Sequence, residues 1–181
     1  RVLVCEVMGR HAGWIAMYAG VAGGAAAILV PEKPFDIDEV AIAIKARHGK
    51  GRFASIVVVA EGALPREGTL ATQSGAQDAF GHVRLGGIGQ VVANALEERT
   101  GFETRVTVLG HIQRGGTPTA FDRVLATRFG LHAIDAVHSG KYGQMVSARG
   151  ADVVLVPLSE AVGELKTVDD AFLAEMSVFT G

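Results

Sequence analysis

Short apolar runs alternate with helical segments along the whole chain, and this alternation restricts the fold more than any other feature. The expected strands cover residues 2–7, 27–30, 55–60, 106–109 and 153–157, and the expected helices cover 12–22, 36–48, 88–99, 120–137 and 167–176. Strands that alternate with helices form a parallel sheet covered by helices. The sequence therefore predicts an α/β fold, with ligand-binding groups at the carboxyl ends of its strands.

The composition excludes several classes of protein. Hydrophobic residues make up 49% of the 181 residues, so the chain can bury a sizeable core, and its net charge of −2 argues against general affinity for nucleic acids or membranes. We find no signal peptide and no apolar stretch of membrane-spanning length. The single cysteine, Cys5, excludes an internal disulfide framework, which fits a reducing cytosol.

Three of the expected strands end in groups suited to binding. Met8-Gly9-Arg10 follows the first strand, Glu61 follows the third, and His111-Ile112-Gln113-Arg114 follows the fourth. Guanidinium groups match phosphate oxygens, a carboxylate can accept hydrogen bonds from sugar hydroxyls, and the helix after Arg10 should offer free amide N–H groups. Each feature also has a structural interpretation: a surface arginine in a turn, a helix-capping glutamate, a core histidine. Together they favour a phosphorylated ligand.

Two further arginines, Arg1 and Arg105, precede strands and fall at the opposite end of the sheet. Five extended residues span about 17 Å, so Arg105 and Arg114 cannot easily hold one phosphate within one subunit. Arg1 and Arg105 are therefore either solvated charges or side chains that reach into the site of a neighbouring subunit.

Of two nucleotide-binding motifs, one is incomplete in this sequence and the other is absent. Gly86-Gly87-Ile88-Gly89 resembles a dinucleotide fingerprint, but Val92 occupies the third glycine position and no convincing strand precedes it, which disfavours a nicotinamide-dependent dehydrogenase. The chain has no P-loop, and its six histidines and one cysteine show no zinc-site spacing.

Residues 63–82 lack periodicity and predict a long functional or mobile loop.

The chain resembles 6-phosphofructokinases. The matching stretches are Arg1–Arg10, Glu61-Gly62 and Arg105–Gly116, followed by Pro118 and Asp122-Arg123. The block Val-Leu-Gly-His-Ile-Gln-Arg-Gly-Gly within the third stretch is highly specific. The resemblance covers essentially the whole chain and corresponds to the C-terminal portion of a family member, with the run His11-Ala12-Gly13-Trp14 and the loop near residue 70 most similar to actinobacterial-type ATP-dependent enzymes. We expect the chain, which enters a strand directly after Arg1, to be a fragment.

The resemblance implies roles for these residues. Besides binding the sugar phosphate, Arg10 would stabilise charge on the transferred phosphoryl group. Arg1 and Arg105 would reach the sugar phosphate from an adjacent subunit of a homotetramer. The residues that would bind fructose 6-phosphate within their own subunit are Met8, Gly9, Arg10, Glu61, His111, Ile112, Gln113 and Arg114.

The resemblance also implies a three-layer, two-lobed fold. Residues 1–110 would form most of the substrate lobe, 111–160 would return to the nucleotide lobe, and 161–181 would cross back as a tail. Missing strands would leave sheet edges and apolar helix faces uncovered, so we expect the isolated chain to be poorly soluble.

The implied activity is transfer of a phosphoryl group to the 1-hydroxyl of fructose 6-phosphate, a step of glycolysis in the cytoplasm. ATP with Mg²⁺ is the expected donor; the alternatives are pyrophosphate as donor or a non-catalytic, phosphosugar-binding regulatory subunit. The family's Gly-Gly-Asp and Thr-Ile-Asp-Asn-Asp segments, which hold the nucleotide with Mg²⁺ and supply the catalytic base, are absent from these 181 residues. We therefore expect no metal ligands in this chain and no activity from the chain alone.

Overall fold

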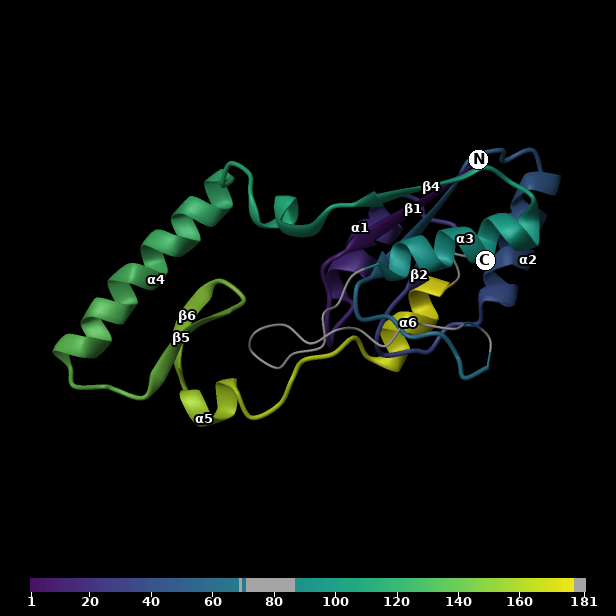
Figure 1. The fold of residues 1–181 in the computed structure, drawn as a ribbon. Coiled ribbons are helices and arrows are strands. Elements are labelled where there is room, and N and C mark those ends of the chain that lie inside the picture. Colours follow the sequence, from purple (N-terminus) through teal and green to yellow (C-terminus); the bar gives the residue numbers. More distant parts are fainter. Residues whose placement is uncertain (69, 71–86, 178–181) are drawn as a thin grey trace. The chain divides into compact units, whose positions relative to one another are not determined.

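The structure is a computed structural model that describes residues 1–68, 70 and 87–177. The chain divides into two compact units (Figure 1). Unit 1 consists of residues 1–114 together with the tail from Thr167, and unit 2 consists of Gly115–Lys166. Most of the loop expected at residues 63–82 lies outside the described residues.

Unit 1 contains a parallel sheet of four strands in the order β2-β3-β1-β4. The strands are β1 (Val2–Val7), β2 (Ala27–Leu29), β3 (Ser55–Ala60) and β4 (Thr104–Val108). In the central pairs, Val7 lies opposite Ala60 and Glu6 lies opposite Val108. The carboxyl ends of β1, β3 and β4 therefore meet at one edge of the sheet.

Helices cover both faces of this sheet, so unit 1 has three layers (Figure 1). Side chains of α2 (Ile37–Gly49) and α3 (Ile88–Thr100) pack into one core with the sheet, and α1 (Trp14–Ala22) and α6 (Asp170–Ser177) pack into a second core on the other face. The largest fully buried side chains are Ile37, Ile44, Leu96, Val2, Val4, Val57, Val59 and Val92. The predicted parallel α/β fold is confirmed for unit 1.

Several boundaries differ from the expected ones for local reasons. α1 begins at Trp14 rather than residue 12, because Gly13 is its N-cap. β4 begins at Thr104, so Arg105 lies inside the strand and not before it. β4 is an edge strand with largely exposed side chains, so it can include polar residues at its start. The prediction used the apolar pattern alone and therefore placed the start of this strand too late. α6 begins at Asp170, after Asp169 accepts a hydrogen bond from the Phe172 N–H at 2.7 Å.

Unit 2 consists of α4 (Ala120–His138), β5 (Gln144–Arg149), β6 (Asp152–Pro157) and the short α5 (Leu158–Ala161). β5 and β6 pair antiparallel, so the expectation that the last strand joins a parallel arrangement is wrong. The prediction missed β5, whose side chains are mostly exposed and lack a clear apolar alternation. Gly150, with φ of 61°, forms the tight turn that folds β6 back onto β5.

Candidate functional site

The loops that follow β1 and β4 are joined directly at the carboxyl edge of the sheet. The Met8 N–H donates to Oε1 of Gln113 at 2.7 Å, although the two residues are 105 positions apart in the sequence. Gln113 belongs to the 3-10 helix η1 (Gly110–Arg114), which follows β4 after a short connection. The parallel register brings these two strand ends together, and the amide side chain then fixes the distance between the loops.

The loop after β3 is tied to the loop after β1 in the same way. The Glu61 N–H donates to the Val7 carbonyl at 2.9 Å, and the Gly62 N–H donates to the Gly9 carbonyl at 3.0 Å. The Gly9 N–H in turn lies 3.5 Å from Oε1 of Glu61. An ionised carboxylate has about four acceptor positions, so the half-buried Glu61 can accept further hydrogen bonds from a ligand.

Two glycines permit this close approach of backbones. A Cβ atom built on Gly62 would lie 2.0 Å from the Arg10 carbonyl oxygen. Gly9 has φ of +149°, and its Cβ would lie 2.8 Å from the Ala12 carbonyl oxygen. Any larger side chain would have to push the loops apart, so both positions require glycine in this arrangement.

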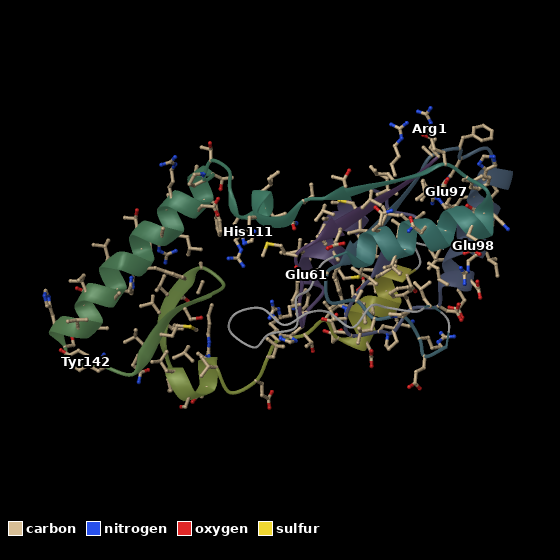
Figure 2. All side chains as sticks on the ribbon, viewed as in Figure 1. Arg1, Glu61, Glu97, Glu98, His111 and Tyr142 are labelled. Carbon is tan, nitrogen blue, oxygen red and sulfur yellow. The ribbon has the colours of Figure 1, made fainter. Side chains whose placement is uncertain are left out.

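The same edge carries three exposed cationic or ionisable side chains, Arg10, His111 and Arg114. His111 is exposed, so the interpretation as a buried core histidine does not apply. Figure 2 shows Glu61 and His111 near this edge and Arg1 at the far end of the sheet. The arrangement offers guanidinium and imidazole donors for an anion, beside a carboxylate acceptor for hydroxyl groups.

Two of the expected ligand contacts, Gln113 and Ile112, also make hydrogen bonds within the protein. The side-chain oxygen of Gln113 is bonded to Met8, so its amide group holds the loops in place. Ile112 is 79% exposed, and its N–H donates to the Leu109 carbonyl at 3.2 Å. Neither interaction was visible from the sequence, because both depend on the turn that η1 makes.

The expectation of free amide groups at the start of α1 is wrong at Gly13. Its N–H lies 2.9 and 3.1 Å from the two carboxylate oxygens of Glu32, in the segment after β2. Oε1 of Glu32 also accepts from the Val168 N–H at 2.9 Å. An internal carboxylate thus binds the N-cap N–H at this helix N-terminus, and it ties the C-terminal tail to the loop that carries Arg10.

A second internal carboxylate occupies the N-terminus of α3. Glu6 is 3% exposed, and its oxygens accept from the Gly87 N–H at 3.2 Å and from the Gly89 N–H at 2.7 Å. Gly87 and Gly89 of the failed dinucleotide motif therefore bind a side chain of β1. Sequence reasoning missed Glu6 and Glu32; a charged residue within the apolar run of residues 2–7 was the one available signal.

The opposite edge of the sheet holds Arg1 and Arg105, as expected from their places in the sequence. Both pair with one residue that the prediction did not include, Glu103. Nε of Arg1 lies 3.0 Å from Oε2, and Nη2 of Arg105 lies 2.7 Å from Oε1. The hydrogen bond from Arg105 and the positive charges of Arg1 and Arg105 hold the pKa of the Glu103 carboxyl below its usual value.

The part of the chain that the structure describes offers neither a metal site nor a reactive thiolate. There, no three metal-ligating side chains lie close enough together to hold an ion. Burial raises the pKa of the Cys5 thiol, which disfavours a reactive thiolate. None of the described helices combines the length and apolar character needed to cross a membrane.

Comparison with known proteins gives one consistent family. Residues 1–137 match the family model described as phosphofructokinase. The chain is 58% identical, over its full length, to a pyrophosphate–fructose 6-phosphate 1-phosphotransferase of Streptomyces coelicolor, of which it covers 53%. It is also 55% identical over 97% of its length to ATP-dependent 6-phosphofructokinase 3 of the same organism, of which it covers 51%.

Solved structures agree with this result. A phosphofructokinase from Saccharomyces cerevisiae matches 99% of the chain with a TM-score of 0.71 and 33% identity, and the match covers 22% of that protein. A pyrophosphate-dependent phosphofructokinase from Marinobacter aquaeolei matches 93% of the chain with a TM-score of 0.73 and 26% identity, and the match covers 42% of that protein. The chain spans about half the length of the curated relatives it matches.

Proposed function

Because the chain belongs to the phosphofructokinase family, we propose that it supplies the fructose 6-phosphate half-site of an enzyme that transfers a phosphoryl group to the 1-hydroxyl group. The product is fructose 1,6-bisphosphate. The observation that carries this proposal is the joining of three strand-end loops at one edge of unit 1, through the Met8–Gln113 and Gly9–Glu61 contacts. That edge combines exposed cations with a carboxylate, which suits a ligand that has both a phosphate and hydroxyl groups.

Each side chain has a distinct part in this proposal. His111 and Arg114 bind the 6-phosphate, and Glu61 accepts hydrogen bonds from the sugar hydroxyls. Arg10 lies on the loop between β1 and α1 and stabilises negative charge on the phosphoryl group during transfer. Phosphoryl transfer depends mainly on positioning and charge stabilisation, and the tied loops provide the fixed positions. Gln113 holds the loop that carries Met8 in place.

Arg1 and Arg105 complete the phosphate site of a neighbouring subunit in this proposal. In their own subunit they lie at the amino-terminal edge of the sheet, with Leu3 opposite Arg105 in the strand register. His111 follows the other end of β4. One phosphate cannot readily contact both ends of the same sheet, so the proposal requires an assembly, which we take to be a homotetramer in the cytoplasm.

The donor half of the reaction lies outside these 181 residues in our proposal. The described residues offer no cluster that fits Mg²⁺, so we assign no step to that ion here, and we expect its ligands and the catalytic base on other segments. ATP remains our first choice as donor. The relatives named above include both ATP- and pyrophosphate-dependent enzymes, which makes pyrophosphate the specific alternative.

The proposal further divides the chain between lobes. Residues 1–110 form most of the substrate lobe, 111–160 return to the nucleotide lobe, and 161–181 cross back. Without the base and the donor site, the 181-residue chain by itself forms no fructose 1,6-bisphosphate. Product formation by the purified chain would overturn this part of the proposal.

The test of the function uses the intact protein, with fructose 6-phosphate and either ATP or pyrophosphate. We expect fructose 1,6-bisphosphate to form with one of the two donors. Glu61→Gln should raise the KM for fructose 6-phosphate by about tenfold, because hydrogen bonds to a charged group are lost, whereas the donor KM should change little. Glu98→Gln, on the exposed surface of α3 (Figure 2), is the matched control. Absence of product with both donors would contradict the proposal.

A further inference from the structure

Two guanidinium groups from neighbouring strands converge on one carboxylate at the amino-terminal edge of unit 1. Arg1 directly precedes β1, and Arg105 lies in β4, which pairs with β1. Arg105 binds Oε1 of Glu103 through Nε at 3.0 Å and Nη2 at 2.7 Å, and Arg1 binds Oε2 at 3.0 Å. The Val2 N–H also donates to the Glu103 carbonyl at 2.9 Å, which fixes the backbone of Glu103 beside β1.

This cluster has the donor geometry of a phosphate site with a carboxylate in it. Arginine forks bind carboxylates and phosphates in the same way, through parallel N–H donors. The side chains of Arg1, Arg105 and Glu103 are 75%, 67% and 48% exposed, and exposed ion pairs contribute little to stability. A dianionic phosphate that approaches from solvent can therefore replace Glu103 at little cost to the fold.

We propose that Glu103 is a built-in competitor for the phosphate that Arg1 and Arg105 receive from the neighbouring subunit. The inference rests on the proposed function, which places Arg1 and Arg105 at that phosphate. Glu103 holds the two guanidinium groups together in the empty state and opposes the incoming phosphate by like charge. It thereby sets the affinity for fructose 6-phosphate without touching the reacting atoms.

The ionisation of Glu103 supports this role. Hydrogen bonding to Arg105, together with the charges of Arg1 and Arg105, keeps the pKa of Glu103 below its ordinary value, so the carboxylate is charged at neutral pH. A second negative charge close to a phosphate weakens phosphate binding even in a water-like dielectric. Removing that charge while keeping the shape of the side chain should strengthen binding.

The experiment is steady-state kinetics of the intact protein with Glu103→Gln. We expect the KM for fructose 6-phosphate to fall by about fivefold, with kcat and the donor KM within about twofold of the parent. The difference in the KM for fructose 6-phosphate between Glu103→Gln and the parent should shrink as salt is added, because the side chains of Glu103 and of both arginines are exposed. Glu98→Gln removes a charge elsewhere on unit 1 and should leave the KM unchanged.

A second variant, Arg105→Ala, separates this inference from the proposed function. If Arg105→Ala raises the KM for fructose 6-phosphate but Glu103→Gln leaves it unchanged or raises it, the neighbouring-subunit site stands and the competitor role of Glu103 is overturned. If neither variant changes the KM, both the shared site and the role of Glu103 are wrong. A lowered KM for Glu103→Gln with a raised KM for Arg105→Ala supports both.

Discussion

Units 1 and 2 bury their apolar residues to very different extents. Unit 1 has two cores, one on each face of its sheet. In unit 2, all of which the structure describes, Ala136 is the one buried residue, and α4 exposes Phe121, Val124, Leu131, Ile134 and Val137. Unit 1 therefore has packed cores that can hold a site in place, whereas the exposed apolar side chains of unit 2 require a covering surface. All the strand-end residues of the candidate site belong to unit 1.

The largest expected effect compares one leucine from each unit. Leu96 of α3 is fully buried and Leu131 of α4 is 62% exposed. Leu96→Ala should lower the free energy of unfolding by about 2–5 kcal/mol, because it removes buried methyl groups and leaves a cavity. Leu131→Ala should change it by less than about 0.5 kcal/mol. Denaturant unfolding of the 181-residue chain measures both, in dilute solution because we expect the isolated chain to be poorly soluble, and similar losses for the two variants would break the comparison.

Glycines give the next contrast. Gly62→Ala should destabilise unit 1 by about 3 kcal/mol, because its Cβ meets the Arg10 carbonyl and the backbone has to move. Gly130, inside α4, has no heavy atom within 4 Å of an added Cβ. Gly130→Ala should therefore stabilise unit 2 by about 0.5–1 kcal/mol through higher helix propensity. Thermal unfolding measures the loss of stability for Gly62→Ala and the gain for Gly130→Ala. A Gly62→Ala variant with unchanged stability would show that the loops after β1 and β3 approach each other less closely than in this structure.

Gln113→Ala tests the link between the loops after β1 and β4. Its loss leaves the partly buried Met8 N–H without the Gln113 acceptor, at a cost of about 1–2 kcal/mol. In the intact protein, we expect kcat/KM for fructose 6-phosphate to fall by about tenfold, since the loop that carries Arg10 loses its fixed position. Gln144→Ala, on the exposed β5, serves as control. Equal kinetics for the two variants would mean that Gln113 positions nothing.

The smallest effect concerns the start of α4 and its dependence on pH. The Thr119 N–H and hydroxyl donate to Asp122 at 2.9 and 2.8 Å, and these bonds hold the pKa of Asp122 below its usual value. Stability from a lowered carboxyl pKa is present above the unfolded pKa and is lost as the pH falls through the folded one. Helix content followed by circular dichroism should therefore decline below about pH 4. Asp122→Asn should remove this dependence, and an unchanged pH profile would show that the capping box contributes nothing.

Sequence patterns predicted those parts of the molecule that depend on local apolar spacing. The buried strands β1 and β3 and the helices α2 and α3 were expected within one or two residues of their observed bounds, because core positions recur at fixed intervals. β5 was missed, since an exposed hairpin strand places no such demand on its side chains. The placement of Glu61 and His111 after strand ends followed from the same logic, because parallel strands share an edge.

The contacts that hold the site together could not be predicted, because they join residues that are distant in the sequence. The Gln113–Met8 bond spans 105 positions, and the Glu6–Gly89 bond spans 83. No pattern within one window of the sequence encodes such pairs. The same limit explains why the Gly13 N–H was expected to be free, whereas Glu32 binds it from another segment.

We propose that unit 1 binds the phosphate of fructose 6-phosphate at the carboxyl edge of its sheet. The most direct measurement is kcat/KM for fructose 6-phosphate in the intact protein with Arg114→Ala, beside Arg149→Ala in unit 2 as control. Loss of a charge-assisted phosphate contact should lower kcat/KM by at least about tenfold for Arg114→Ala, mainly through KM, and leave the control unchanged. Equal kinetics for the two variants would show that Arg114 does not bind the phosphate at this edge.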